Sequence, residues 1–146
     1  MRLLVLAFYL LCLVSCSEEK ALQQQDVLQL HKDKQVSVSL SPADAPVEEV
    51  LNWAIELSDG WQIKQAEVTG VSMSMGTIPL LFKAVDGQPE FYKAEMVLGA
   101  CSQPKMKWQL QLKLHHATQG EKLLLLPFYS SWPDSVSYTH LRAHET

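Results

Sequence analysis

The sequence lacks the motifs and the charge that would point to an enzyme or to a nucleic-acid-binding protein. Its 146 residues contain no glycine-rich phosphate loop, no His-Glu-x-x-His, no Cys-x-x-Cys and no nucleophile elbow. The formal net charge is −4, whereas nucleic acid or an anionic membrane surface as the main partner would call for a basic face. We therefore expect a protein that is not an enzyme and that has no nucleic-acid partner.

Cysteine is scarce in the part of the chain that can fold. Of the three cysteines, Cys12 and Cys16 lie near the N-terminus, so Cys101 stands alone and no internal disulfide is possible in the domain. A single thiol in an oxidising compartment is a liability unless it is buried, paired with another chain or used as a ligand. Cys101 is therefore either a small buried apolar residue or a metal ligand, and its place in a turn-forming stretch, where a thiol tends to be accessible, favours the second.

Long hydrophobic runs are absent except at the N-terminus. One positive charge precedes an apolar run, residues 3–14, which is too short for a transmembrane helix and indicates an export signal. Residues 13–16, Leu-Val-Ser-Cys, resemble the bacterial lipobox, in which the cysteine is acylated and becomes the mature N-terminus. The resemblance implies lipidation of Cys16 and, because Ser17 follows it, an outer-membrane lipoprotein that faces the periplasm. An ordinary signal peptide cut near Ser15 or Ser17, with Cys16 incidental, is the alternative.

These features divide the chain into four expected segments. They are a lipoprotein signal peptide (1–15), a lipidated N-terminus with a polar tether (16–34), the folded domain (35–135) and a tail (136–146). The tether is rich in Glu and Gln, and its apolar residues hold no clean helical face, which predicts disorder.

The last eleven residues of the chain are treated separately from the domain. Residues 136–146 resemble one reading frame of a common sequencing adapter. We therefore do not count His140 and His144 as ligands, and we expect the genuine C-terminus to be missing after about Ser135. A genuine disordered tail is the alternative.

From residue 35 onward, apolar and polar residues alternate, which is the pattern of half-buried strands. Strands are expected at 36–40, 51–57, 61–75, 78–82, 92–98, 106–114 and 123–126. About seven short strands without a convincing core helix predict an all-β fold, an Ig-like antiparallel β-sandwich. Trp53 and Trp108 occupy the apolar phase of their strands and are expected in its core.

Sulfur-bearing residues lie close to turns at two places in the domain. Met73 and Met75 alternate just before a turn, and side chains two apart in an extended strand face the same way, about 6.5–7 Å apart. The apolar phase shifts near Gly70, which predicts a bulge there that re-aims the following side chains. Cys101 and Met106 follow further along the chain. Sulfur donors that converge at one pole of the sandwich predict a soft-metal site, with copper(I) as the natural cofactor.

Each of these residues also has a structural explanation. Met106 begins the core-facing ladder of its strand, so packing can account for it, whereas Met73 and Met75 lie beside serines and are explained less readily by packing. His115 and His116 end the same strand, roughly 30 Å from Met106 at ~3.3 Å per residue. We interpret these histidines as a solvated strand end, with an adventitious metal site as the alternative.

Several short motifs carry a resemblance that runs from about Gln35 to Ser131. They are Met73-x-Met75-Gly76, Ile78-Pro79, Leu98-Gly99-x-Cys101 and Met106-x-Trp108. On these motifs the domain resembles an uncharacterised family of proteobacterial exported lipoproteins often found beside respiratory-oxidase assembly genes, and more remotely the YtkA-like and FixH-like Ig-like domains. The resemblance implies copper handling, with a copper-receiving oxidase subunit or assembly factor as the partner. The chain departs from these relatives because it has no FixH-like membrane helix and no His-Met spacing like that of periplasmic copper chaperones.

Two hypotheses of function follow. The first is a lipid-anchored periplasmic protein that binds or donates copper(I) through Cys101, Met73, Met75 and Met106. The second is a structural or adaptor envelope lipoprotein whose Ig-like module binds another protein and whose sulfurs belong to the core. The alternating Met-Ser residues and the thiol in a loop favour the first, and the absence of a histidine near the sulfurs favours the second.

Overall fold

The computed structural model describes residues 26–58 and 60–132, and these form nine β-strands without a helix. The strands are β1 (Leu28–Lys32), β2 (Val36–Ser41), β3 (Val50–Leu57), β4 (Trp61–Gly70), β5 (Thr77–Pro79), β6 (Lys83–Val85), β7 (Gln88–Val97), β8 (Lys105–His116) and β9 (Gly120–Ser131). Within these two ranges there is accordingly no helix long and apolar enough to cross a membrane. Cys16 with the predicted export signal, and the tail 136–146, lie outside the described residues.

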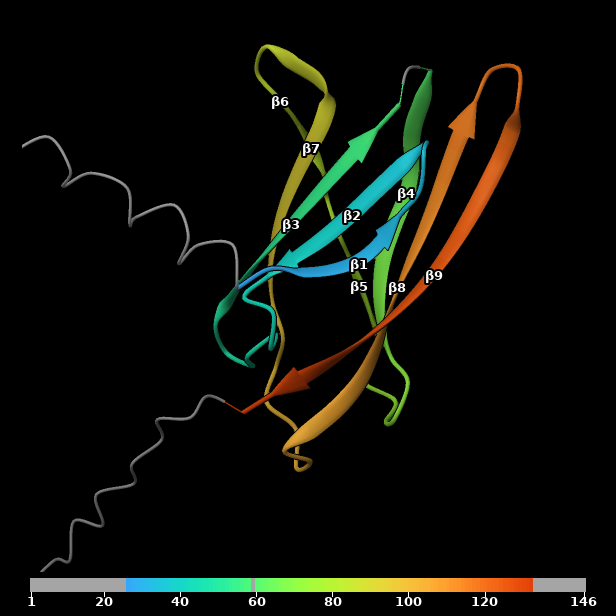
Figure 1. Ribbon diagram of the computed structural model, residues 1–146. Helices are drawn as coiled ribbons and strands as arrows, with labels where there is room; N and C mark the ends of the chain where they lie inside the picture. Colours follow the sequence, from blue (N-terminus) through green and yellow to red (C-terminus); the bar gives the residue numbers. More distant parts are fainter. Residues whose placement is uncertain (1–25, 59, 133–146) are drawn as a thin grey trace, which may run out of the picture.

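The described strands form two antiparallel sheets that pack as a β-sandwich (Figure 1). One sheet has five strands in the order β1-β2-β3-β7-β6, and the other has four in the order β5-β4-β8-β9. β8 and β9 form a long hairpin whose register does not shift along its length. The prediction of an all-β antiparallel sandwich is confirmed, although the described residues contain more strands than the seven expected.

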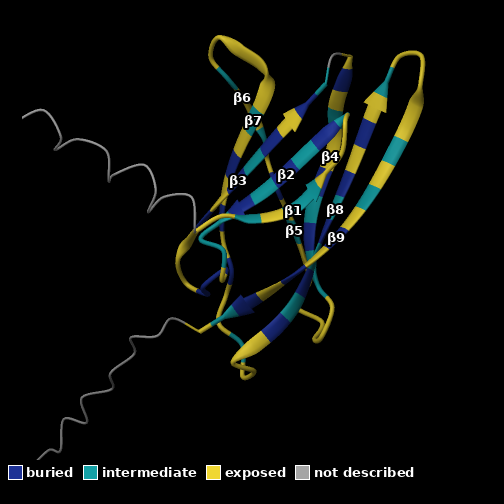
Figure 2. Cartoon of the chain, viewed as in Figure 1, coloured by how far each residue is buried: buried dark blue, intermediate teal, exposed yellow. Residues whose placement is uncertain are grey.

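One side of each main strand faces a single apolar core (Figure 2). In β2 and β8 every second residue is buried, as the two-residue period of a strand requires. Trp53 and Trp108, predicted to be core residues, are each 1% exposed. Trp53 of one sheet meets Phe128 of the other edge to face, with ring centroids 5.3 Å apart. Trp108 donates its indole N–H to the buried hydroxyl of Ser130 at 3.1 Å.

Strand β1 corrects the prediction of a disordered tether, because it lies inside the stretch 16–34. It pairs antiparallel with β2, and Leu28 and Leu30 pack partly buried against the core. A register shift between Gln29 and His31 interrupts the alternation after these two leucines. Two apolar residues are too few to identify a strand from the sequence. β1 is an edge strand that depends on its pairing with β2, and the sequence of β1 alone does not show this pairing.

The expected strand 61–75 is shorter than predicted. β4 ends at Gly70, and residues 71–76 form a loop, so Met73 and Met75 do not lie on a strand. The predicted bulge is also displaced, since the register shifts between Ile63 and Gln65 rather than at Gly70. The extra residue at that bulge changes the apolar phase between Ile63 and Ala66. The change of phase near Gly70 has a different cause, because the strand ends there and residues 71–76 form a loop.

The expected strand 78–82 is wrong, because only its first two residues lie in a strand, β5, and residues 80–82 connect β5 to β6. β5 is an edge of the four-stranded sheet, and β6 is an edge of the five-stranded sheet. Leu80, between them, is 3% exposed. The chain therefore crosses from one sheet to the other within a few residues, which a run of apolar residues cannot reveal.

β9 continues in register through Pro127, where we expected the strand to end. At its far end Ser131 donates its N–H to Ala45 O at 3.2 Å and accepts from Val47 N at 2.9 Å. The backbone groups of Ser131 therefore point away from β8. Because this direction alternates along an antiparallel strand, the nitrogen of Pro127 points the same way, and the β8–β9 ladder loses no hydrogen bond there.

The four leucines 123–126 were predicted to form a buried strand, but only one face of this strand is buried. Leu126 is 7% exposed, whereas Leu123 and Leu125 are 53% and 50% exposed. These two face the outer side of the four-stranded sheet, next to Lys113 and Gln111 of β8.

Candidate metal centre

The predicted sulfur ligands lie on two loops and one strand at the same end of the sandwich. The loop of residues 71–76 follows β4, and the loop that carries Cys101 follows β7; both lie at the lower end in Figure 1. Met73 and Met75 belong to the first loop, and Met106 is the second residue of β8. The expected arrangement of two methionines along one strand is wrong, but both still reach the predicted pole.

Backbone hydrogen bonds hold the 71–76 loop against the start of β8. Val71 N donates to Lys107 O at 2.8 Å, and Ser72 N donates to the same oxygen at 3.3 Å. Lys107 N donates in return to the hydroxyl of Ser72 at 2.9 Å. Lys107 is the neighbour of Met106, so these bonds fix the loop beside that thioether.

Cys101 and Met73 are in direct contact. The thiol of Cys101 donates to the thioether of Met73, with Sγ and Sδ 3.1 Å apart, which is a weak hydrogen bond. Two sulfurs bound to one metal ion at about 2.3 Å each lie at most ~4.6 Å apart. This pair therefore needs little movement to share an ion. The side chain of Cys101 is partly buried against the core, and its thiol is not in a disulfide.

Gly70 allows Met75 and Met106 to approach the same place. A methyl group on Gly70 would lie 2.5 Å from Met106 Cε, 2.5 Å from the carbonyl oxygen of Met73 and 3.3 Å from Met75 Cβ. Non-bonded carbons prefer about 3.5–4.0 Å, so a side chain here would displace its neighbours. The sequence marked Gly70 as a change of phase, but its role is this close packing at the end of β4.

Burial differs sharply among the sulfur residues. Met106 is 1% exposed, whereas Met73 and Met75 are each 37% exposed. Cys101 is intermediate. The candidate centre thus has one thioether on the core side and two on the solvent side, so solvent and other molecules can reach it.

Soft sulfur donors are the metal-binding groups that this end of the molecule offers. Among residues 26–58 and 60–132, no three His, Cys, Asp or Glu side chains gather as a metal site. Thioethers and thiolate select soft ions such as copper(I), whereas carboxylate and carbonyl oxygens suit magnesium and calcium. The residues present therefore fit copper(I) in chemical type.

His115 and His116, which we predicted to stay outside the metal site, lie at the opposite end of β8. Nδ1 of His116 accepts hydrogen bonds from the N–H groups of Thr118 and Gln119, at 3.2 Å each. Its ring centroid lies 5.2 Å from that of Trp61. His116 therefore closes the β8–β9 turn, and the length of β8 separates it from the sulfurs.

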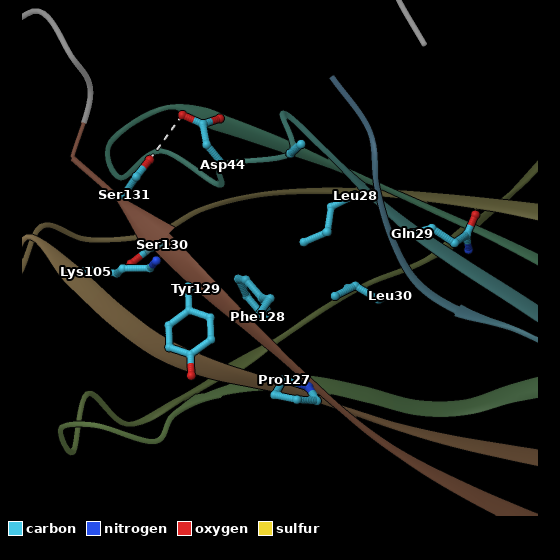
Figure 3. Close-up of a pocket in the computed structure, with 11 residues that line it drawn as sticks. Leu28, Gln29, Leu30, Asp44, Lys105, Pro127, Phe128, Tyr129, Ser130 and Ser131 are labelled. Atoms are coloured by element: carbon cyan, nitrogen blue, oxygen red, sulfur yellow. Dashed lines mark hydrogen bonds between the residues drawn. The ribbon is translucent and has the colours of Figure 1, made fainter. Parts of the chain in front are cut away.

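A cavity of about 480 Å³ between β1 and β9 was not anticipated from the sequence (Figure 3). Leu28, Leu30 and Phe128 line its apolar part, and Lys105 and Tyr129 lie at its border, with the Lys105 Nζ 5.3 Å from the centroid of the Tyr129 ring. The available signal was the alternation of Leu28 and Leu30, which we had assigned to the tether. The size is within the usual ~300–1,000 Å³ of small-molecule sites, but the described side chains place no buried charge in it.

Comparison with known proteins assigns no family to the chain. No family model matches the sequence, and no curated protein matches it. The structure is similar to the crystal structure of a DUF4426 family protein from Pseudomonas aeruginosa PAO1, with 13% sequence identity and a TM-score of 0.43 over 74% of this chain and 100% of that chain. The class that the fold defines is an antiparallel β-sandwich, and the links to lipoproteins and oxidase assembly stay predictions.

Proposed function

We propose that this protein binds copper(I) through Cys101 and Met73, with Met75 and Met106 in supporting roles, and donates it to another protein. The observation that carries the proposal is the 3.1 Å contact between Cys101 Sγ and Met73 Sδ. It occurs where Met75 and Met106 both approach Gly70. A donor set of this softness favours copper(I) over harder ions.

The sulfurs would have different parts in binding. Cys101 loses its proton when the metal binds and supplies the strongest bond, while the thioethers carry no proton to lose. Met106 is buried and would support the ion from the core side. Met73 and Met75 are exposed, so a receiving protein can replace them one at a time with its own ligands. This exposure supports donation rather than long-term storage.

The proposed location is the periplasmic face of the outer membrane, with the acyl chains of Cys16 as the anchor. Two or more acyl chains hold a protein stably on a membrane, whereas one does not. Cys16→Ser should therefore move the protein from the membrane fraction to the soluble fraction. A wild-type protein found wholly in the soluble fraction would end the lipoprotein proposal. The proposed receiver is a respiratory-oxidase subunit or an assembly factor, and no enzymatic activity is proposed.

A competition titration against a copper(I) chelator tests the metal site. The protein should carry Cys12→Ser and Cys16→Ser, so that Cys101 is its single thiol. We expect a single copper(I) ion per chain, and Cys101→Ser should weaken binding about 100-fold or more, or ~2.7 kcal/mol. Met73→Leu should weaken it about 3- to 10-fold, because the volume is kept and only the thioether is lost.

The matched control changes metal-capable residues at the other end of β8. His115→Ala combined with His116→Ala should leave the copper(I) affinity unchanged. Binding should weaken as the pH falls, because protons compete for the thiolate of Cys101 but not for the thioethers. No binding, or binding that does not respond to Cys101→Ser, would refute the copper proposal.

The second candidate function is a structural or adaptor module of the cell envelope. The burial of Met106, at 1% exposure, and the packing of Cys101 against the core favour it. In that case the sulfurs fill space, so Cys101→Ala should change the free energy of unfolding while the wild-type protein binds no copper(I). The titration and an unfolding measurement on the same variants separate the two functions.

A further inference from the structure

Strand β4 ends at Gly70 although its partner β8 continues beyond that point. The last pair of their ladder is Gly70 with Trp108, and the next pair would be Val71 with Lys107. A hydrogen-bonded pair of an antiparallel ladder exchanges two N–H···O bonds. Val71 N does donate to Lys107 O, at 2.8 Å, but among the described residues no bond runs back from Lys107 N to Val71 O.

The hydroxyl of Ser72 replaces the missing acceptor. Lys107 N donates to Ser72 Oγ at 2.9 Å, and Ser72 N donates to Lys107 O at 3.3 Å. Both backbone groups of Lys107 are therefore satisfied, as such groups require, but one partner is a side chain. A serine hydroxyl offers the backbone an alternative to a sheet ladder, so the chain can leave the sheet here without an unpaired N–H.

The point at which the chain leaves the sheet decides where the thioethers lie. Met73 directly follows Ser72, and its Sδ lies 3.1 Å from Cys101 Sγ. If β4 continued past Val71, Met73 would lie on the extended strand and not in the loop that now reaches Cys101. Ser74 is exposed in the same loop, but no hydrogen bond joins its hydroxyl to β8 among the described residues. The two serines of one loop therefore differ in a single contact.

We infer that Ser72 is a positioning residue of the metal site: its hydroxyl ends β4 and holds Met73 and Met75 where they can share an ion with Cys101. The inference rests on the proposed copper(I) site and adds a residue that supplies no ligand atom. Ligands that are already held in place lose less conformational entropy when they bind, and hydrogen bonds from the surrounding residues hold them. Ser72 acts on the ion only through the methionines of its loop.

The reactivity of Cys101 without metal tests the position of the loop. The full-length variant proposed for the titration has Cys101 as its single thiol, so iodoacetamide alkylates that residue alone. Met73 lies against this thiol, and Ser72→Ala should raise the alkylation rate about three- to ten-fold, the effect of one lost hydrogen bond. Ser74→Ala is the matched control and should leave the rate unchanged. Ser72→Thr should keep the wild-type rate, because it keeps the hydroxyl and the position is exposed.

The copper(I) affinity tests what the position is for. In the chelator titration, Ser72→Ala should weaken binding about three- to ten-fold, whereas Ser74→Ala and Ser72→Thr should not. In a chain that also carries Met73→Leu and Met75→Leu, Ser72→Ala should have no further effect, because no thioether is left for it to position. A general loss of stability would instead weaken binding equally in both chains.

Alkylation rates that Ser72→Ala and Ser74→Ala change equally would overturn the inference. So would a loss of copper(I) affinity that persists in the chain without the two thioethers. A wild-type chain that binds no copper(I) but shows the expected alkylation rates would refute the proposed function and still support the role of Ser72 in placing the loop.

Discussion

The two ends of β8 both carry side chains that can bind a metal, and the chain uses them differently. At one end, the ring nitrogen of His116 accepts two backbone N–H groups and closes a turn. At the other end, Met73 and Met75 keep 37% of their surface exposed, and the thiol of Cys101 touches the thioether of Met73. A ligand atom is available to a metal only where the surrounding backbone does not already depend on its lone pair. Four predictions test how far this contrast holds.

The largest expected effect comes from Trp108, which lies next to the sulfur end of the core. Trp108→Ala should lower the free energy of unfolding by about 3–5 kcal/mol, because it leaves a large cavity. Denaturant unfolding followed by circular dichroism measures this. A loss under ~1 kcal/mol would mean that the phase of β8 is wrong.

The phenylalanine variants of the two tryptophans provide the matched control. Trp108→Phe removes the donor to the buried hydroxyl of Ser130, so it should cost more than Trp61→Phe. The indole N–H of Trp61 is buried and has no hydrogen-bond partner among the described residues, and removing it should relieve a penalty.

The second prediction concerns the histidine end. His116→Ala should lower the free energy of unfolding by about 1–2 kcal/mol, because two turn N–H groups lose their acceptor and the contact with Trp61 is lost. The copper(I) affinity should not change. A fall in affinity together with the loss of stability would show that the two ends are coupled and do not have separate roles.

The third prediction concerns the glycine on which the sulfur end depends. Gly70→Ala should weaken copper(I) binding about ten-fold, or ~1.4 kcal/mol, because the new methyl group meets Met106 Cε and the carbonyl oxygen of Met73. Gly99→Ala is the control, since a Cβ there meets nothing within 4 Å. Equal copper(I) affinities for the two variants in the chelator titration would show that the close packing at Gly70 does not contribute to the metal site.

The smallest expected effect is that of pH on the histidine end. Lys122 foremost, with His31 and the N–H groups of Gln35 and Val36, holds the pKa of Asp33 well below its usual range. A carboxylate with a lowered pKa stabilises the fold above its unfolded-state pKa, and this stabilisation is lost as the pH falls below about 4. Lys122→Met should therefore cost less than ~1 kcal/mol at neutral pH, because the pair is partly exposed to solvent.

Denaturant unfolding at pH 7 and at pH 3 checks this prediction. The difference between wild type and Lys122→Met should shrink at the lower pH. Lys64→Met is the control, since Lys64 and Glu121 are 57% and 60% exposed and their pair should contribute little at either pH. A difference that grows at low pH would contradict the assigned role of Asp33.

Sequence patterns predicted the interior of the sandwich better than its edges. β2, β3 and β8 were predicted because each shows the two-residue period of a strand that is buried on one side. β1 was missed because a register shift leaves it two apolar rungs. β9 was cut short at Pro127 because the tolerance for proline depends on which side of the strand is unpaired.

For the candidate site, the sequence supplied the residue types and the structure supplied the arrangement. The four sulfur residues were selected because soft donors close to turns could converge at one pole of the sandwich, but the reason given for Met73 and Met75, a shared strand face, was wrong. They reach Cys101 because the loop after Gly70 folds back onto Lys107. The pole at which they meet was predicted, whereas the close approach at Gly70 was not.

By itself the sequence determined the phase of β2, β3 and β8, the two core tryptophans and the class of fold, because these follow from a local alternation of apolar and polar residues. Only the tertiary structure decided that Cys101 and Met73, 28 residues apart, place their sulfurs 3.1 Å from one another. It also decided that His116 accepts hydrogen bonds from a turn and that β9 is the last strand of its sheet among the described residues. These properties depend on which distant segments pair and on which side a backbone group faces, and neither is written in the order of residues within a single strand.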